Sequence, residues 1–229
     1  MSHRIPSYMT HPVANNAPMA PQASQSANDE TARVRRYFAT RAAGYDAASR
    51  RGLWRYLRSL ETPAVIKVAD VKPGERVLDA GCGTGHYAEV LMQAGARVTG
   101  LDIEPTMLEA VRSRLCIVTI QGDLLNTRLE PNFDKIVCAG VLEFVPQRSL
   151  ALANLTTALR TDGPRQIIML VLARCLAGCA YWGTRRLNGI SMPMFTRDGL
   201  DELAASAGLQ VESASRAGYN WVARLTPRP

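Results

Sequence analysis

The chain of 229 residues is long enough for one substantial α/β domain, and its 47% hydrophobic and 21% charged residues are typical of a globular protein. Its formal net charge of +7 is compatible with an anionic partner. However, all 27 basic residues except Lys67, Lys72 and Lys135 are arginine, which favours codon bias over a nucleic-acid surface. The five cysteines show no metal-binding spacing, so we expect a reduced cytoplasmic protein without a metal site.

The N-terminal part is predicted to form two segments ahead of the main domain. Residues 1–28 are rich in Pro, Ala, Ser, Asn and Gln, which predicts a disordered tail. Residues 29–71 are predicted to form N-terminal lid helices. Between Arg33 and Arg58 this segment contains eight arginines and a single acid, Asp46. This basic cluster suits an anionic substrate and a solvated helix face equally well. We find neither an apolar leader nor an apolar run of the roughly 20 residues that a membrane-spanning helix needs.

Residues 72–229 alternate short apolar runs with amphipathic segments of helical length, which is the pattern of a doubly wound α/β fold with a parallel sheet. Residues 167–182 are interpreted as a buried strand that continues into a helix. The segment between the fifth strand and Thr196 is predicted to be irregular and to border the ligand crevice. The predicted strands are 76–79, 97–102, 117–121, 135–139, 166–171, 211–216 and 221–226, and the predicted helices are 85–94, 105–114, 148–159 and 197–207.

A glycine-rich loop follows the first of these strands, in the sequence DAGCGTG from Asp79 to Gly85. Glycines at a strand-to-helix turn let the backbone pass close to a ligand. A dinucleotide fingerprint would need a third small residue where this chain has His86. An acid at the strand tip also repels a pyrophosphate, whereas it suits a ligand with an ammonium group. The loop therefore favours S-adenosylmethionine over a nicotinamide dinucleotide.

Acids at the ends of the next two strands support the same ligand. Asp102 ends the second strand, where a carboxylate can accept both ribose hydroxyls. Asp123 follows the third strand, where its side chain and backbone can contact the adenine amino group. The fourth strand ends at residues 138–140, above the expected donor.

The sequence resembles the class I S-adenosylmethionine-dependent methyltransferases over about residues 34–226. VLDAGCGTG, VTGLD, GDLL and FDKIVCAGVLEFV match the successive motifs of that family. The resemblance implies a Rossmann-like seven-stranded sheet of order 3-2-1-4-5-7-6, with the last strand antiparallel and helices on both faces. The chain looks most similar to the small-molecule branch that contains malonyl-carrier-protein and ubiquinone methyltransferases, and partly to the magnesium-protoporphyrin methyltransferases.

The resemblance also implies the site residues. YFATRAAGYDAASRR is similar to a segment whose tyrosine closes over the donor, which makes Tyr45 a lid residue. Many relatives have histidine at the position of Phe144, so a frequent candidate base is absent, and the remaining candidates for catalysis are Glu143, His86 and Tyr45. The predicted cofactor-binding residues are Tyr45, Asp79, Gly81, Cys82, Gly83, Gly85, Asp102, Ile103, Gly122, Asp123, Leu124, Ala139 and Gly140.

The predicted reaction is transfer of a methyl group to O, N or S, and less readily C, of a small molecule or carrier-bound acid. We expect an acceptor that is anionic or carrier-bound, no nucleic-acid partner, and a monomer or homodimer. Three alternatives are a nucleic-acid methyltransferase, a non-catalytic S-adenosylmethionine-binding module and a nicotinamide oxidoreductase. The first rests on charge alone, the second is disfavoured by the intact motif residues, and the third by Asp79 and His86.

Overall fold

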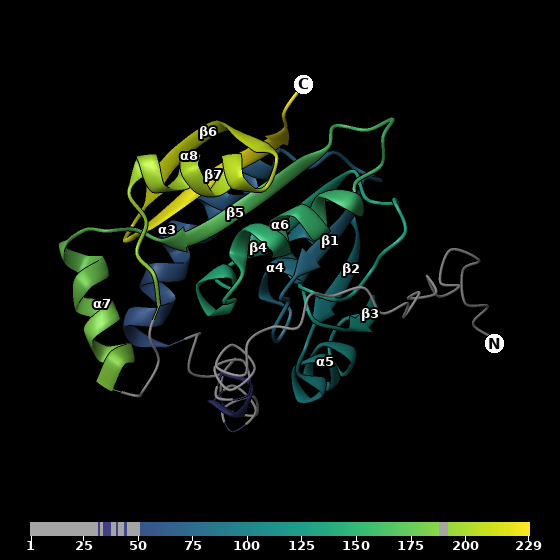
Figure 1. Ribbon diagram of the computed structural model, residues 1–229. Helices are drawn as coiled ribbons and strands as arrows, with labels where there is room; N and C mark the ends of the chain where they lie inside the picture. The colour runs from purple at the N-terminus through teal and green to yellow at the C-terminus, as the bar shows by residue number, and fades with distance from the viewer. Residues whose placement is uncertain (1–31, 33, 38–39, 41–43, 45–50, 188–191) are drawn as a thin grey trace.

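The protein is built on one seven-stranded sheet with the strand order β3-β2-β1-β4-β5-β7-β6, which confirms the predicted fold (Figure 1). The computed structural model describes residues 32, 34–37, 40, 44, 51–187 and 192–229. The predicted tail of residues 1–28 therefore lies outside the described residues. The strands are β1 (Arg76–Ala80), β2 (Arg97–Asp102), β3 (Val118–Gln121), β4 (Lys135–Ala139), β5 (Gln166–Leu172), β6 (Leu209–Ala217) and β7 (Asn220–Pro227).

The first five strands run parallel, so their carboxyl ends meet at one edge of the sheet, which we call the carboxyl edge. β7 pairs antiparallel with both β5 and β6, as predicted. The turn that joins β6 to β7 contains Gly218, whose positive φ of 59° suits a glycine. Because β7 is inserted antiparallel, its first residue, Asn220, pairs with the last residue of β5, Leu172, at the carboxyl edge.

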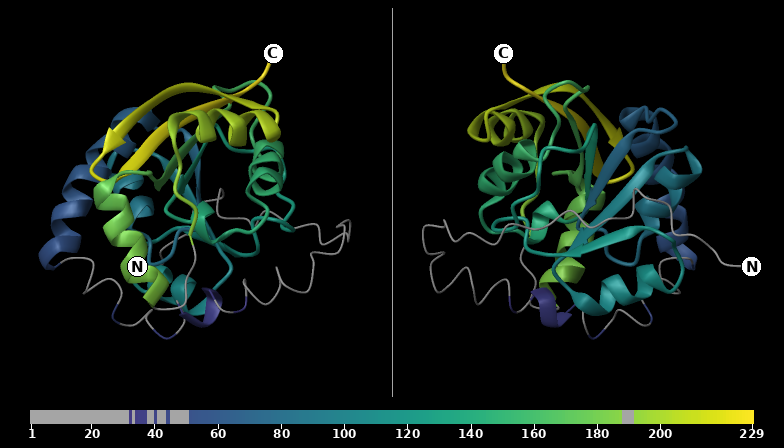
Figure 2. Two further views of the ribbon diagram at one scale, coloured as in Figure 1. Left: turned by 60° about the vertical axis from the view of Figure 1, so that its left-hand side comes forward. Right: turned by 90° about the vertical axis from the view of Figure 1, so that its right-hand side faces the viewer.

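Helices cover both faces of the sheet (Figure 1, Figure 2). Alternate residues of a strand point to opposite faces, so Val77 of β1 packs on one side and Leu78 on the other. Val77 belongs to the core beneath α3 (Gly52–Ala69) and α4 (His86–Gln93), beside which lies α5 (Pro105–Arg112). Leu78 belongs to the core beneath α6 (Arg148–Thr157) and α8 (Arg197–Ser206).

The helix α3 is part of this core. Its Val65 and Ala69 are fully buried, and it contacts β5 and β7. The division of the chain into residues 29–71 and 72–229 stays a prediction, but α3 already shares the core of the larger segment. None of the described helices combines the length and the hydropathy needed to cross a bilayer.

The segment after β5 contains the helix predicted to follow the buried strand, but this helix is longer than predicted. β5 ends at Leu172, and α7 (Leu176–Leu187) follows after three residues. The ring of Tyr181 stacks on that of Tyr219 with centroids 5.0 Å apart, and the indole N–H of Trp182 donates to the carbonyl of Met192 over 3.0 Å. The stacked rings and the hydrogen bond attach the helix to the residues around Tyr219 and Met192. The prediction of a strand that continues into a helix over residues 167–182 is confirmed, and the prediction of an irregular segment up to Thr196 is wrong for residues 176–187.

At the opposite edge of the sheet, where β1 and β4 begin, Lys135 is only 3% exposed. Its Nζ lies 2.9 Å from Oε2 of Glu75 and donates to the carbonyl of Asp70 over 2.7 Å. Removal of one partner from a buried ion pair leaves the other charge without compensation.

We expect Glu75→Ala to lower the free energy of unfolding by about 3 kcal/mol, because it leaves the Lys135 ammonium buried without its carboxylate. Urea denaturation measures this loss. Glu202→Ala, at an exposed position on α8, is the control and should change little. Addition of Lys135→Met to Glu75→Ala should restore part of the loss, and a double variant no more stable than Glu75→Ala would contradict the explanation.

Candidate active site

The glycine-rich loop between β1 and α4 is shaped by three residues with positive φ. Gly81, Gly83 and Gly85 have φ angles of 77°, 52° and 83°. A Cβ at Gly81 would lie 2.5 Å from Cγ2 of Val141, so this position admits only glycine. A Cβ at Gly83 would meet no atom within 4 Å, so its backbone is open to a ligand. Gly85 caps α4 instead of facing a ligand.

The carboxylate of Asp102, at the end of β2, holds this loop in place. Its Oδ2 accepts a hydrogen bond from the N–H of Gly83 over 2.8 Å, and its Oδ1 accepts one from the N–H of Glu104 over 2.9 Å. Burial raises the pKa of Asp102 above its ordinary value, and the two backbone donors offset part of that effect. The side chain predicted to bind ribose thus also connects the loop after β1 to the loop after β2.

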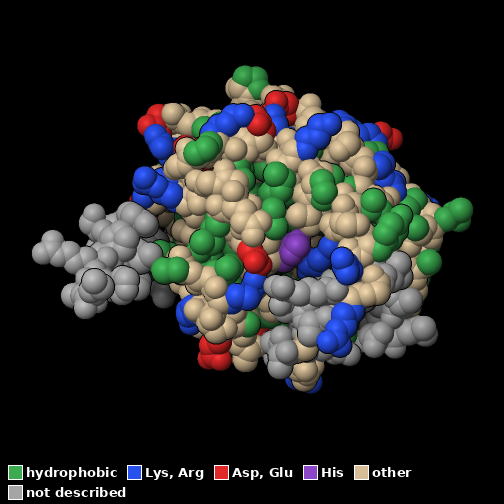
Figure 3. All heavy atoms as spheres, turned by 180° about the vertical axis from the view of Figure 1, so that it is seen from behind, with side chains coloured by type: hydrophobic (Ala, Val, Ile, Leu, Met, Phe, Trp, Pro, Cys, Tyr) green, Lys and Arg blue, Asp and Glu red, His purple; other side chains and the backbone are tan. Residues whose placement is uncertain are grey.

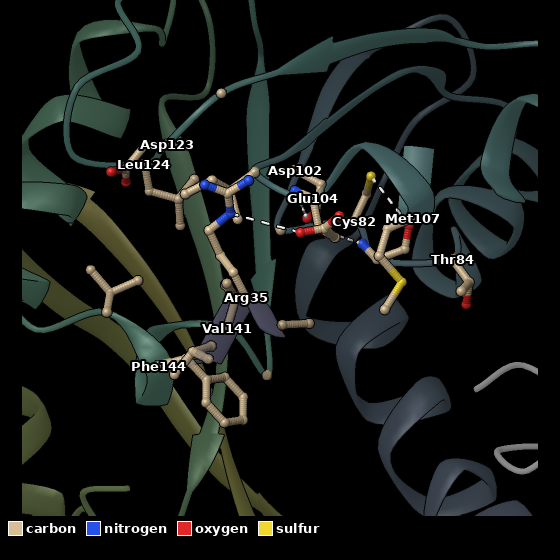
Figure 4. Close-up of a pocket in the computed structure, with 18 of the residues that line it drawn as sticks. Arg35, Cys82, Thr84, Asp102, Glu104, Met107, Asp123, Leu124, Val141 and Phe144 are labelled. Atoms are coloured by element: carbon tan, nitrogen blue, oxygen red, sulfur yellow. Dashed lines mark hydrogen bonds and ion pairs between the residues drawn. The ribbon is translucent and has the colours of Figure 1, made fainter. Parts of the chain in front are cut away.

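A pocket opens over this loop at the carboxyl edge (Figure 4). It brings together most of the predicted cofactor residues, together with His86. Those that line it are Gly81, Cys82, Gly83, Asp102, Ile103, Gly122, Asp123, Leu124, Ala139 and Gly140.

The pocket also contains residues that sequence reasoning missed. Arg35 and Arg58 belong to the cluster of eight arginines between Arg33 and Arg58. The charge of that cluster suggested an anionic ligand, but the sequence pattern did not distinguish these two arginines from the other six. Glu104 follows Asp102 by two residues, and Phe144 was noted only as a replacement for histidine. The residues that were not predicted are Val34, Arg35, Arg58, Thr84, Tyr87, Glu104, Met107, Leu125, Val141, Phe144, Val145 and Pro146.

Asp123 combines two roles in the turn after β3. Its Oδ1 accepts from the N–H of Leu125 over 2.9 Å and its Oδ2 from the amide of Asn126 over 3.2 Å, which fixes the turn. Gly122 must be glycine, because a Cβ there would lie 2.1 Å from Oγ1 of Thr127. The carboxylate of Asp123 is therefore positioned by its own turn while it lines the pocket.

Asp79 is not on the pocket wall. It is 2% exposed, beneath the glycine loop, and its Oδ2 has no hydrogen-bond partner among the described residues. Burial raises the pKa of Asp79 to about 7, opposed by a backbone hydrogen bond from Ala88 and reinforced by the charge of Asp102. Asp79, which was predicted to bind the cofactor, therefore lies beneath the residues that line the pocket.

Of the two predicted catalytic residues that the structure describes, Glu143 and His86, only His86 lies on the pocket wall. It begins α4, and its Nε2 lies 2.8 Å from Oγ1 of Thr62 on α3. Arg58 precedes Thr62 by one helical turn and also lines the pocket. No carboxylate of the described residues lies within ion-pair distance of Arg58. Viewed from behind the molecule, basic side chains gather beside the histidine drawn in purple (Figure 3).

Glu143 is directed away from the pocket, and Tyr45 lies outside the described residues. Glu143 belongs to the short 3-10 turn Leu142–Phe144 after β4 and is 6% exposed. Its Oε1 accepts from the N–H of Leu172 over 2.7 Å, and its Oε2 has no partner among the described residues. Burial raises the pKa of Glu143 to about 7, partly offset by backbone hydrogen bonds and by Arg148.

The raised pKa of Glu143 predicts a pH dependence of stability. The folded state keeps a proton that the unfolded chain releases near pH 4.5, so this stabilisation is complete below pH 4.5 and is lost as the pH rises through about 7. Glu143→Gln removes the ionisation and keeps the acceptor for Leu172. We expect the wild type to lose up to about 3 kcal/mol more than Glu143→Gln in free energy of unfolding between pH 5 and pH 8.

Denaturant unfolding at these two pH values measures the difference. The matched control is Glu202→Gln, at an exposed position, which should follow the wild type. Parallel pH profiles of the wild type and Glu143→Gln would contradict a buried proton at Glu143.

Comparison with known proteins agrees with this geometry. A family model described as a methyltransferase domain matches residues 78–165. Malonyl-[acyl-carrier protein] O-methyltransferase of Serratia marcescens is 32% identical over 143 residues, which are 60% of this chain and 53% of that protein. The chain thus spans about half the length of that relative, and 41% of the ubiquinone biosynthesis O-methyltransferase of Xanthomonas campestris.

Solved structures show the same fold. Magnesium protoporphyrin IX methyltransferase from Synechocystis, with bound S-adenosylhomocysteine, is 21% identical with a TM-score of 0.67, and the match covers 87% of this chain and 100% of that chain. A TehB-like methyltransferase from Corynebacterium glutamicum is 25% identical with a TM-score of 0.59, over 85% and 98% of the two chains.

A longer sequence match is to the ubiquinone biosynthesis O-methyltransferase of Xanthomonas euvesicatoria. It is 30% identical over 173 residues, which cover 68% of this chain and 72% of that protein. Similarity over this share of both proteins shows the family, and the chain belongs to the class I S-adenosylmethionine-dependent methyltransferases.

Proposed function

We propose that the protein transfers a methyl group from S-adenosylmethionine to an oxygen atom of a small molecule or carrier-bound acid, in cofactor or secondary-metabolite biosynthesis in the cytoplasm. The observation that carries the proposal is the junction at Asp102, which holds the glycine loop open toward the pocket. The names of the malonyl-carrier-protein and ubiquinone relatives, both O-methyltransferases, support oxygen as the acceptor atom.

The residues of the pocket fit this donor. The ribose hydroxyls would bind the carboxylate of Asp102, and adenine would lie toward Ile103, Asp123 and Leu124. The positions of Gly83 and Gly140 have no atom within 4 Å of an added Cβ, so a ligand can contact the backbone there. Asp79 lies beneath the loop, and its Oδ2 has no hydrogen-bond partner among the described residues, so it remains available as an acceptor for the donor ammonium.

The donor supplies an activated methyl group on its sulfonium, so the protein mainly has to align the acceptor with it and exclude water. Orientation of this kind can lower a barrier by roughly 7–11 kcal/mol. A base is needed only for an acceptor that is protonated at the working pH. Of the predicted candidates we favour His86, because it lines the pocket and Glu143 does not.

The remaining wall of the pocket supports an anionic acceptor. Phe144, Val145 and Pro146 add apolar side chains to the pocket wall, and Arg58 is one of the two arginines that line the same pocket, the other being Arg35. Arg58 lowers the pKa of Glu61 through its charge but has no carboxylate within ion-pair distance among the described residues. A guanidinium can bind a carboxylate or phosphate through two parallel hydrogen bonds. We propose that Arg58 holds the anionic group of the acceptor while its apolar part lies against Phe144. The protein would act as a monomer or homodimer.

For the donor, we expect Asp102→Asn to weaken binding of S-adenosylmethionine about 10- to 100-fold, because a charged acceptor for the ribose hydroxyls is lost. Gly83→Val should abolish binding, since it strains a positive φ and fills the open side of the loop. Isothermal titration calorimetry measures both. Glu202→Gln is the control, and wild-type affinity in Asp102→Asn would contradict the assigned ribose site.

For the acceptor, we expect a labelled small anionic or carrier-bound product when the enzyme, methyl-labelled donor and an extract of the source cells are incubated and analysed by mass spectrometry. Arg58→Ala should reduce its formation about tenfold or more without changing donor affinity, since a charge-assisted hydrogen bond to the acceptor is lost. Arg55→Ala, at an exposed position one turn earlier on α3, is the matched control. Label found only in nucleic acid, or full activity of Arg58→Ala, would contradict the proposal.

A further inference from the structure

An arginine side chain extends into the half of the pocket assigned to the nucleoside. Val34 and Arg35, in the helical residues 34–37, both line the pocket. Nε of Arg35 lies 3.7 Å from Oε2 of Glu104, just after the end of β2. Figure 4 shows the guanidinium of Arg35 between Glu104 and the pair Asp123 and Leu124, which follow β3.

The negative charge of Glu104 explains the position of the Arg35 guanidinium in the pocket. The carboxylate of Glu104 is only 10% exposed, and its charge raises the pKa of the neighbouring Asp102. Oε1 of Glu104 accepts a weak hydrogen bond from Thr106 over 3.3 Å, whereas Oε2 faces Arg35. Among the described residues, Arg35 is the cation within ion-pair distance of Glu104. It therefore compensates the charge of Glu104.

The place that Arg35 takes is the one expected for the donor base. With the ribose at Asp102, the base must lie toward the end of the neighbouring strand, β3, and hence toward Asp123 and Leu124. A planar guanidinium and a planar purine cannot share this space. The side chain of Arg35 is 45% exposed, so it can leave the pocket without disturbing the core.

We infer that Arg35 competes with the donor base for this part of the pocket, and that donor binding requires the Arg35–Glu104 ion pair to open. Opening the pair subtracts from the donor affinity. Partly exposed ion pairs contribute about 0.2–1 kcal/mol, which corresponds to an affinity change of about 1.4- to 5-fold. The inference rests on the proposed donor site and adds a residue that opposes binding there.

The experiment measures the affinity of S-adenosylhomocysteine for the full chain by calorimetry. This probe has no net charge, so its own salt dependence is small. We expect Arg35→Ala to bind it about two- to fivefold more tightly than the wild type. Glu104→Gln should bind more tightly as well, and the double variant should gain no more than Arg35→Ala alone, because both changes break the same pair.

Salt gives a second readout that a purely structural role would not change. Added salt screens the ion pair, so the wild-type affinity should rise with ionic strength while that of Arg35→Ala stays constant. Arg36→Ala is the matched control, since Arg36 is exposed and does not line the pocket. Weaker binding with faster dissociation in Arg35→Ala would show that Arg35 holds the base, and equal binding would show that it does neither. Both results would overturn the inference, whereas an absence of binding in every variant would instead overturn the donor site itself.

Discussion

The carboxylate of Asp102 is the interaction on which the rest of the pocket depends. It ends β2 and accepts backbone hydrogen bonds from Gly83 and Glu104, which belong to two different loops. Parallel strands bring the two loops to one edge of the sheet, but they do not set the distance between them. Asp102 sets it, with oxygens that also face the pocket. The residue that would recognise the donor is therefore the residue that shapes the site for it.

Three other carboxyl groups are buried near the carboxyl edge of the sheet, and burial makes their ionisation less favourable. Asp79, Glu143 and Glu61 each have a pKa raised to about 7, and burial is the largest cause in every case. Glu61 on α3 accepts a hydrogen bond from the side chain of Asn220 over 2.7 Å. Glu143 accepts one from the backbone N–H of Leu172, and Leu172 of β5 pairs with Asn220 of β7 in the sheet. Glu61 thus joins α3 to the inserted strand β7, and Glu143 joins the turn after β4 to the end of β5. None of the three buried carboxyls Asp79, Glu143 and Glu61 lines the pocket, whereas Phe144, His86 and Arg58 do.

The sequence patterns predicted the strands, most helices and many of the residues that line the pocket after β1, β2 and β3, because each depends on local signals. Glycines at a turn and acids at strand ends are positioned by the backbone next to them. The strand order came from the family resemblance, since periodicity does not tell which strands are neighbours. The main failure of the sequence predictions concerned the direction in which side chains point. Glu143 and Asp79 lie next to pocket residues in sequence, but β-strand and turn geometry directs them into the core. The places of Arg35 and Arg58 depend on how separate helices pack, which no local pattern contains.

The contact between Gly81 and Val141 has a consequence for how this protein can change over time. The two residues come from loops after different strands, and there is no room for even one additional carbon between them. The side chain at position 141 is thus a steric counterpart of the missing one at position 81. Drift at either position is constrained by the other, and a lineage that enlarges one must first reduce or move its counterpart. The glycine-rich loop and the loop after β4 are therefore sterically coupled, although 60 residues of sequence separate them.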